Sequence, residues 1–209
     1  MKKCLCLCIA MLALLTGCQA LIGTETLRLY DLAGGKPISE MESLERMRTA
    51  RVVLVGEHHA EPAHHQAQLA VIEALHRSGR KVAIGLEMFR RDAQADLDGW
   101  VAGSITEDTF VPIYLDNWNF DWELYRPIFA YARRYGLPMI GLNVPRELTR
   151  QVAYHGFDAL SDAQKGELGA ISCDVSPQYR DYVREAYGAH PHGRMNFDHF
   201  CQAQLLWDT

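Results

Sequence analysis

Arg51-Val52-Val53-Leu54-Val55-Gly56-Glu57-His58-His59 is the stretch that decides the fold, because an apolar run ends in a glycine, an acid and two imidazoles. Unbroken runs of β-branched and aliphatic residues predict a strand buried on both faces, as in a parallel sheet. Gly56 allows a tight exit from such a strand. In open α/β sheets the ligand crevice lies beyond the carboxyl ends of the strands. The stretch therefore predicts that Glu57 and His58 reach a binding site.

Two further apolar runs end in the same way. Residues 81–86 are followed by Glu87, and residues 138–142 are followed by Asn143. Any one of these polar residues could equally be a helix cap or a salt-bridge partner. Together with Glu57 and His58 they predict one polar site at one edge of a sheet. The expected fold class is α/β, with a mostly parallel sheet flanked by helices.

Length, composition and charge limit the function classes. The 209 residues favour a single domain, and 48% hydrophobic with 22% charged residues is ordinary for a soluble globular fold. The net charge of -5 gives no basic excess that would attract nucleic acid. No glycine-rich phosphate loop follows any of the expected strands, which argues against a nucleotide-dependent enzyme.

The N-terminus has the pattern of a bacterial export signal. Two lysines and a short apolar run lead into Leu15-Thr16-Gly17-Cys18, which resembles a lipoprotein cleavage box. We expect a signal peptide over 1–17 and a lipid on Cys18; the alternative is an ordinary signal peptide with an incidental cysteine. Gln19 after the cysteine favours the outer membrane. The prediction is a lipid-anchored protein that faces the periplasm or the cell surface.

Removal of the signal peptide and acylation of Cys18 leave two cysteines, Cys173 and Cys201, in a compartment that permits disulfides. A disulfide between them and two free buried thiols both remain open. Their separation in sequence says nothing about whether their geometry suits a bridge.

Residues 18–49 form an expected lead-in, and residues 50–209 form the expected domain. The lead-in has a short strand over 26–31, a turn at Gly34-Gly35, and a helix that Ser39 caps with Glu42 three residues later.

In the domain, helix starts are expected near Pro62, Met88, Pro127, Pro145, Ser161, Ser176 and Asn196. The aromatic stretch 114–122 is expected to be a long irregular loop, which either arches over a flat ligand or anchors the core. The last helix still carries an apolar face at 205–207, so we expect the C-terminal part of the domain to be missing.

Six short segments, in this order and spacing, resemble the ChaN-like haem-binding lipoprotein family. They are Gly56-Glu57-His58-His59, then 62–66, 85–89, 125–127, 141–146 and 200–208. The resemblance implies a lipoprotein that binds haem and takes part in haem and iron uptake. It also implies kinship with Tiki-type proteases and erythromycin esterases, in which a Gly-Glu-x-His motif and a distant glutamate serve hydrolysis. Glu57, His58 and Glu87 match those positions, whereas His59 stands where relatives vary.

For a haem carrier, several side chains qualify as iron ligands, because His and Tyr suit an exposed transport site. They are His58, His59, Tyr154, His192 and His199. Arg146 or Arg150 would meet a haem propionate, and Trp118 or Trp122 would pack on the macrocycle. The sequence does not choose among them. The partners of such a protein are haem, the membrane through the lipid anchor, and either a second copy of the chain or a haem receptor.

Hydrolysis is the alternative function. Glu57, His58 and Glu87 would then hold a divalent metal, or Glu57 would act as general base on water. No His-Glu-x-x-His spacing supports this interpretation, so the chain is expected to be a carrier and its status as an enzyme stays open. A third interpretation is a scaffold in which the polar cluster only stabilises the fold. It is disfavoured because buried imidazoles without partners are costly.

Overall fold

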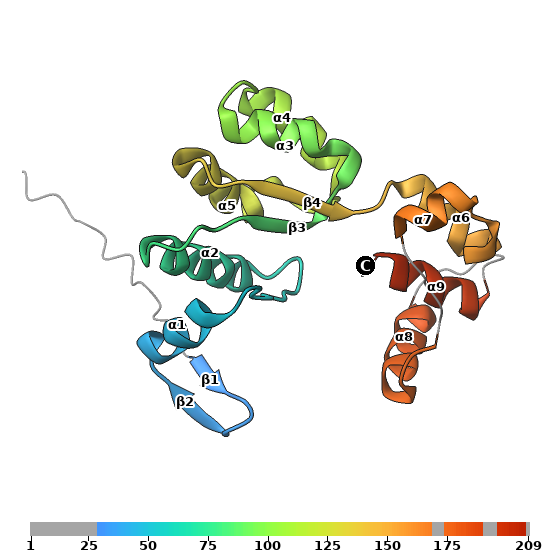
Figure 1. Ribbon diagram of the computed structural model, residues 1–209, viewed down its shortest axis with the longest axis horizontal. Helices are drawn as coiled ribbons and strands as arrows, with labels where there is room; N and C mark the ends of the chain where they lie inside the picture. Colours follow the sequence, from blue (N-terminus) through green and yellow to red (C-terminus); the bar gives the residue numbers. More distant parts are fainter. Residues whose placement is uncertain (1–28, 169–173, 190–195, 208–209) are drawn as a thin grey trace, which may run out of the picture. The chain divides into compact units, whose positions relative to one another are not determined.

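The structure is a computed structural model that describes residues 29–168, 174–189 and 196–207. The chain divides into two compact units, Met1–Ser43 and Leu44–Thr209, and each is described by itself (Figure 1). Strands and helices are mixed, and helices predominate.

The first unit holds an antiparallel hairpin of β1 (Leu29–Asp31) and β2 (Lys36–Ile38). Its turn is at Gly34 and Gly35, as expected; the Asp31 carboxylate accepts from the Gly34 amide at 3.0 Å, and Gly35 has a φ of 61°. Helix α1 (Glu40–Thr49) crosses the boundary between the units. It begins at the predicted cap, where Ser39 Oγ accepts from the Glu42 amide at 3.1 Å.

The second unit contains two parallel strands, β3 (Ile84–Arg90) and β4 (Met139–Asn143), with Ile84 opposite Met139. Before β3 comes α2 (Pro62–Arg77). Between the strands lie the 3₁₀ turn η1 (Arg91–Ala93) and the helices α3 (Gln94–Ala102), α4 (Glu107–Asn117) and α5 (Trp122–Tyr135) (Figure 1). The parallel direction of the two strands confirms the prediction for these two runs.

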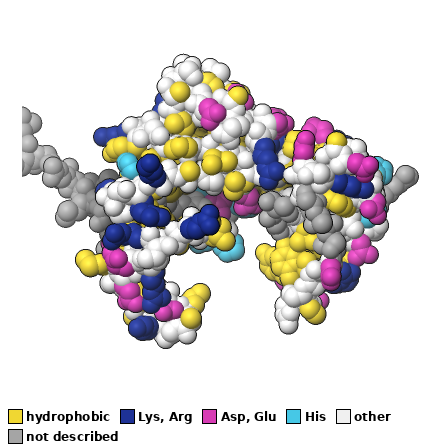
Figure 2. Space-filling model, in the orientation of Figure 1, with side chains coloured by type: hydrophobic (Ala, Val, Ile, Leu, Met, Phe, Trp, Pro, Cys, Tyr) yellow, Lys and Arg dark blue, Asp and Glu magenta, His cyan; other side chains and the backbone are white. Residues whose placement is uncertain are grey.

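One face of β3 and β4 carries the core. Side chains alternate along both strands, so that Leu86 and Met139 are buried, while Ile140 and Leu142 are 43% and 48% exposed. The core is strongly aromatic and includes Phe89, Phe110, Tyr114, Tyr125 and Phe129, none of which has any exposed area. On the face drawn in Figure 2, hydrophobic side chains also gather in the region of β3 and β4. Burial of these rings removes large apolar surfaces from water and so stabilises the unit.

The expected first strand over 51–55 is wrong. These residues have no strand pairing, and Val52 and Leu54 are 72% and 91% exposed. A parallel strand exists only where a neighbour completes its ladder. Among the described residues β3 and β4 pair only with each other, and the Val55 carbonyl instead accepts from the Gln68 side chain at 3.3 Å. A mostly parallel sheet is therefore not confirmed.

The expected long loop over 114–122 is also wrong. Helix α4 continues to Asn117 and α5 starts at Trp122, which leaves only 118–121 between them. The reason is local capping. Thr106 Oγ1 accepts from the Thr109 amide at 3.3 Å, and Asp121 Oδ1 accepts from the Glu123 amide at 3.1 Å. Pro127 therefore lies inside α5 and does not start it.

After β4 come α6 (Arg146–His155), the turn η2 (Phe157–Ala159), α7 (Asp162–Leu168), α8 (Pro177–Ala189) and α9 (Phe197–Trp207), close to the predicted starts. Helix α9 packs on α6, and Asn196 Oδ1 caps it by accepting from the His199 amide at 2.8 Å. Cys201 is fully buried and disulfide-bonded, and Cys173 lies outside the described residues. Within the described part of the chain, no helix has the length and apolar character needed to cross a membrane.

Candidate functional site

Glu57 is the centre of a partly buried polar cluster. Its side chain is 8% exposed. Oε1 accepts hydrogen bonds from the Tyr125 hydroxyl and from His59 Nδ1, the latter at 2.9 Å. Oε2 lies 3.1 Å from His65 Nδ1 without hydrogen-bond geometry, and the Gln68 side chain also lies close enough to the carboxylate to lower its pKa. The cluster thus joins the loop at 56–61 to α2 and α5.

The first turn of α2 holds this loop in place. Pro62 starts the helix, and the Glu61 side chain caps it by accepting from the Ala63 amide at 3.3 Å. This start turns His64 and His65 back toward the loop. His64 Nδ1 accepts from the His58 amide at 2.8 Å, and His65 Nε2 lies 3.0 Å from the His59 carbonyl oxygen.

Both ring nitrogens of the buried His65 face oxygen atoms. Nε2 faces the His59 carbonyl oxygen at 3.0 Å, and Nδ1 faces Gln68 Oε1 at 3.1 Å. The Gln68 side-chain nitrogen donates to the Val55 carbonyl at 3.3 Å, so Gln68 links His65 to the segment before Glu57. His65 is thus held beside the Glu57 carboxylate from both sides of its ring.

The surroundings of Glu57 favour its charged form. Burial alone would raise the pKa of the carboxyl, but the hydrogen bonds from Tyr125 and His59 and the charge of His65 bring the pKa below its ordinary value. Burial and the bond to Glu57 raise the pKa of Tyr125, so its hydroxyl keeps the proton that it donates.

His59 presents a free nitrogen at the surface of this cluster. Its Nδ1 donates to Glu57, and its Nε2 makes no hydrogen bond with any described residue. The side chain is 37% exposed. Its ring meets the rings of Trp118 and Phe120 edge to face, with centroids 4.7 and 4.9 Å away. A histidine held by a carboxylate in this way has a fixed tautomer and a more basic second nitrogen, as metal-binding histidines do.

The two other predicted strand ends take different places. Glu87 Oε1 accepts from Trp207 Nε1 at 3.0 Å, and the Trp207 ring stacks on Trp118 with centroids 6.4 Å apart. Glu87 is thus linked to the site through two indoles. Asn143 is buried; its amide donates to the Glu87 carbonyl at 3.0 Å and its oxygen accepts from the Val144 amide at 2.8 Å. Asn143 thus ties the end of β4 to the interior of β3, because Glu87 lies within that strand and not at its end as predicted.

Comparison with known proteins identifies the chain. The family model described as haem-binding uptake, Tiki superfamily, ChaN matches residues 43–209. The chain belongs to this family. The resemblance seen in the sequence is confirmed.

This ChaN-family chain is similar to one curated protein and to one solved structure. Protein RETICULATA-RELATED 5, chloroplastic, of Arabidopsis thaliana is 25% identical over 152 residues, which are 67% of this chain and 20% of that protein. The chain therefore spans about a fifth of the length of this curated relative. A solved structure described as cofacial heme binding to ChaN of Campylobacter jejuni aligns with a TM-score of 0.56 and 20% identity. The alignment covers 83% of this chain and 67% of that one, which shows a shared fold.

The remaining predicted ligands of this ChaN-family chain lie elsewhere. The exposed His58 ring stacks on His64, with centroids 5.4 Å apart, and makes no hydrogen bond or ion pair with the Glu57 side chain. Tyr154 is exposed on α6. His199 Nδ1 is buried without a hydrogen-bond partner among the described residues. Cys18 and His192 lie outside the described residues.

Of the two predicted propionate partners, one is close to the aromatic rings. Arg146 donates to the Asn117 carbonyl at 3.4 Å, next to Trp118 in the chain. Arg150 is exposed on α6 and makes no hydrogen bond or ion pair with a described residue. Of the residues predicted to contact haem, His59 and Arg146 therefore lie at or beside this site. Tyr125, His65 and Trp207 were missed as site residues, although all three lie within or beside the family-like segments.

The alternative metal triad does not form in the described part of the chain. No three His, Cys, Asp or Glu side chains there are grouped so that they could hold a metal ion. Since His58 stacks on His64, Glu57 and Glu87 lack the imidazole that the triad needs. A metal-dependent hydrolase is not favoured.

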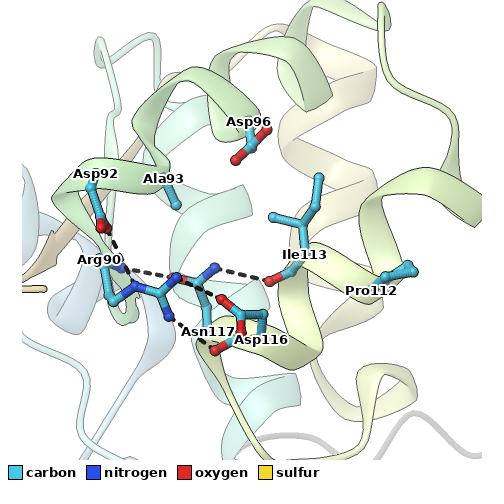
Figure 3. Close-up of a pocket in the computed structure, with 8 residues that line it drawn as sticks. All are labelled: Arg90, Asp92, Ala93, Asp96, Pro112, Ile113, Asp116 and Asn117. Carbon is cyan, nitrogen blue, oxygen red and sulfur yellow. Dashed lines mark hydrogen bonds and ion pairs between the residues drawn. The ribbon is translucent and has the colours of Figure 1, made fainter. Parts of the chain in front are cut away.

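A hollow of about 400 Å³ lies between β3, η1, α3 and α4 (Figure 3). The Arg90 guanidinium spans it, donating to Asp92 at 3.3 Å and to Asp116 at 2.7 Å. Hydrogen bonding to Arg90 lowers the pKa of Asp116. The side-chain oxygen of Asn117 accepts from the Arg90 backbone amide at 3.1 Å, and its side-chain nitrogen donates to the Ile113 carbonyl at 2.9 Å. The side chains that line the hollow therefore bond mainly to one another. Together these bonds fix the end of α4 just before Trp118.

Proposed function

We propose that this chain binds haem and that His59 is the ligand to its iron. The observation that carries the proposal is the Glu57–His59 pair, in which a buried carboxylate holds Nδ1 and leaves Nε2 free at the surface. Neutral imidazole held through its other nitrogen is a common iron ligand, and the carboxylate increases its basicity. The family is described as haem-binding, and the Campylobacter jejuni structure is described as cofacial heme binding. Both descriptions support haem as the molecule that this chain binds.

The surroundings of His59 suit a flat aromatic ligand. Trp118 and Phe120 flank the ring, and Trp207 extends the aromatic surface behind Trp118. Such rings supply apolar area for a macrocycle. Trp118 is itself buried, so the accessible ring faces are those of the partly buried Phe120 and Trp207.

Arg146 is the proposed partner of a haem propionate. Among the described residues its guanidinium makes one hydrogen bond, to the Asn117 carbonyl, which leaves further donors for a carboxylate beside Trp118. Charge-assisted bonds of this kind orient carboxylates strongly. Arg150 lacks such a link to the aromatic rings.

We further propose that the chain is a lipoprotein attached through Cys18 to the outer membrane, and that it takes part in haem and iron uptake. The cleavage-box pattern at 15–18 and the uptake function in the family description support this. A second copy of the chain or a haem receptor would then receive or supply the haem.

Titration with haemin tests the proposal. The mature chain should develop the Soret band of ligated haem, and His59→Ala should weaken binding roughly tenfold or more. The matched control is His76→Ala, which changes a histidine bonded to Tyr131 and away from the site. Retention of full affinity by His59→Ala would show that the iron ligand is another residue. A wild-type chain that gives only the spectrum of free haemin would remove haem binding itself.

A further inference from the structure

A group of cations surrounds the end of α2. Arg77 is the last residue of the helix and is 68% exposed, and Arg80 and Lys81 follow it on the exposed segment that leads to β3. The Arg80 amide donates to the Leu75 carbonyl at 3.3 Å, so the chain folds back over the helix end and keeps the three residues there. Among the described residues Arg77 alone of the three forms an ion pair, with Glu73 at 3.1 Å.

The end of α5 adds a fourth cation and an exposed ring. Tyr131 links the two helices, because its hydroxyl lies 2.9 Å from His76 Nδ1. Burial raises the pKa of Tyr131, while Arg77 and Arg134 act in the opposite direction, so both guanidinium groups lie near this hydroxyl. Arg134 lies over the Tyr135 ring, 5.4 Å from its centroid, and that ring is 46% exposed. We call these four cations and this ring the basic patch: Arg77, Arg80, Lys81, Arg134 and Tyr135.

Helix stability accounts for only part of the basic patch. Arg77 and Arg134 lie in the last turns of their helices, where cations complement the helix dipole. Arg80 and Lys81 lie beyond α2, and no described residue forms an ion pair with either. The whole chain has a net charge of -5, so the basic patch is opposite in sign to the chain that carries it. A local reversal of charge of this kind indicates a negatively charged partner.

We propose that the basic patch rests on the anionic phospholipid headgroups of a membrane. Lys and Arg side chains are attracted to such a surface, and their apolar stems, like the ring of Tyr135, suit the boundary between headgroups and acyl chains. A headgroup layer is a continuous negative surface. It can therefore meet cations from two helices and a connecting segment without a matching shape. The inference does not depend on haem binding, and the proposed lipid anchor would hold the chain at the same surface.

The position of the basic patch keeps the Glu57 cluster away from the lipid. Helices α2 and α5 both end on the side where β3 and β4 begin (Figure 1). The Glu57 cluster contacts the first turn of α2, through His64 and His65. The 16 residues of α2 span about 24 Å, so its two ends are far apart. Loss of membrane binding should therefore leave haemin binding unchanged.

Sedimentation with lipid vesicles tests the proposal, using the mature chain with Cys18→Ser as the parent so that no acyl chain contributes. The parent should bind vesicles of equal parts phosphatidylglycerol and phosphatidylcholine, should not bind phosphatidylcholine alone, and should bind less as salt is added. Arg80→Gln with Lys81→Gln should weaken binding roughly twentyfold, because each basic residue near anionic lipid contributes about fivefold. The matched control, Arg150→Gln with Arg184→Gln, removes two exposed charges from α6 and α8 and should bind as the parent does.

Three results would overturn the proposal. They are a parent that does not bind the anionic vesicles, equal losses in the two double variants, and tighter binding to poly-glutamate than to the vesicles, which would assign the basic patch to an acidic protein. Haemin titration of the Arg80→Gln, Lys81→Gln chain should match that of the parent and shows that the variant is folded. Arg134→Gln is a further variant on α5, and it should weaken vesicle binding roughly fivefold.

Discussion

The ring of His65 is bonded to the backbone of His59: its Nε2 lies 3.0 Å from the His59 carbonyl oxygen. The other ring nitrogen lies 3.1 Å from Glu57 Oε2. One buried imidazole ring therefore contacts both the backbone that carries His59 and the carboxylate that orients it.

Replacing His65 should cost more stability than its size suggests. His65→Leu removes the ring nitrogens that face the His59 carbonyl and Glu57 Oε2, and a buried polar group left unpaired typically costs about 1–3 kcal/mol. Urea unfolding at neutral pH measures this loss. The control His58→Ala alters an exposed ring and should stay within about 0.5 kcal/mol of wild type. A His65→Leu chain as stable as that control would contradict the structural role given to His65.

The contribution of Glu57 to stability should disappear in acid. Its folded-state pKa lies below the ordinary value of 4.5, so the stabilisation is present above that pH and is lost as the pH falls through the folded-state pKa. The difference in unfolding free energy between wild type and Glu57→Gln should therefore be largest at neutral pH and shrink below 4.5. Urea unfolding over a pH series checks this. A difference that grows on acidification would mean that Glu57 is protonated in the folded protein.

Asn143 should prove structural. Asn143→Leu leaves the Glu87 carbonyl and the Val144 amide without their partner, and each buried group left unpaired costs about 1–3 kcal/mol. The thermal unfolding midpoint of Asn143→Leu should be lower than that of wild type. The control Asn119→Ala changes an exposed position and should leave the midpoint almost unchanged. Equal midpoints for the two variants would refute the role given to Asn143.

Two strand glycines should respond differently to alanine. A Cβ on Gly141 would lie 2.5 Å from the Arg90 carbonyl oxygen, a backbone atom that cannot move aside. Gly141→Ala should lose about 1–3 kcal/mol of unfolding free energy. In Gly85→Ala the nearest atom is the end of the exposed Leu142 side chain at 2.9 Å, which can rotate away. Gly85→Ala should therefore lose less unfolding free energy than Gly141→Ala. A larger loss for Gly85→Ala would show that β3 and β4 do not approach each other as described.

Haemin titrations should distinguish the roles of Arg146 and Arg150. Loss of a charge-assisted bond costs about 1.5–3 kcal/mol, so Arg146→Ala should weaken haemin binding roughly tenfold. Arg150→Ala removes the same charge from the next turn of α6, where no link to the aromatic rings exists among the described residues, and should bind as wild type does. Equal losses for both variants would indicate general attraction by positive charge.

Local signals in the sequence predicted several helix starts, but the starts expected near Met88, which lies inside β3, and at Pro127, which lies inside α5, are wrong. Ser39, Pro62 and Asn196 each cap or begin a helix where expected, because a capping bond involves only residues a few positions apart. The parallel direction of β3 and β4 also followed from their apolar runs. The strand expected over 51–55 failed because pairing depends on a distant neighbour, which no local pattern reveals.

The site was predicted in part for the same reason. Glu57 could be found because it ends the motif, but the choice of His59 over His58 depends on how the first turn of α2 contacts the loop. Tyr125 comes from α5, 68 positions from Glu57, and only the packing of that helix brings its hydroxyl to the carboxylate. Side chains that converge from separate helices leave no recognisable spacing in the sequence.

The side-chain amide of Asn117 ties the end of α4 to β3, and its backbone carbonyl accepts from the Arg146 side chain of α6. Trp118, the next residue, therefore cannot swing outward unless a helix end, a strand and a second helix yield together. The Trp118 indole already meets the His59 ring edge to face, with centroids 4.7 Å apart, so an incoming planar molecule can only stack against the outside of this pair of rings.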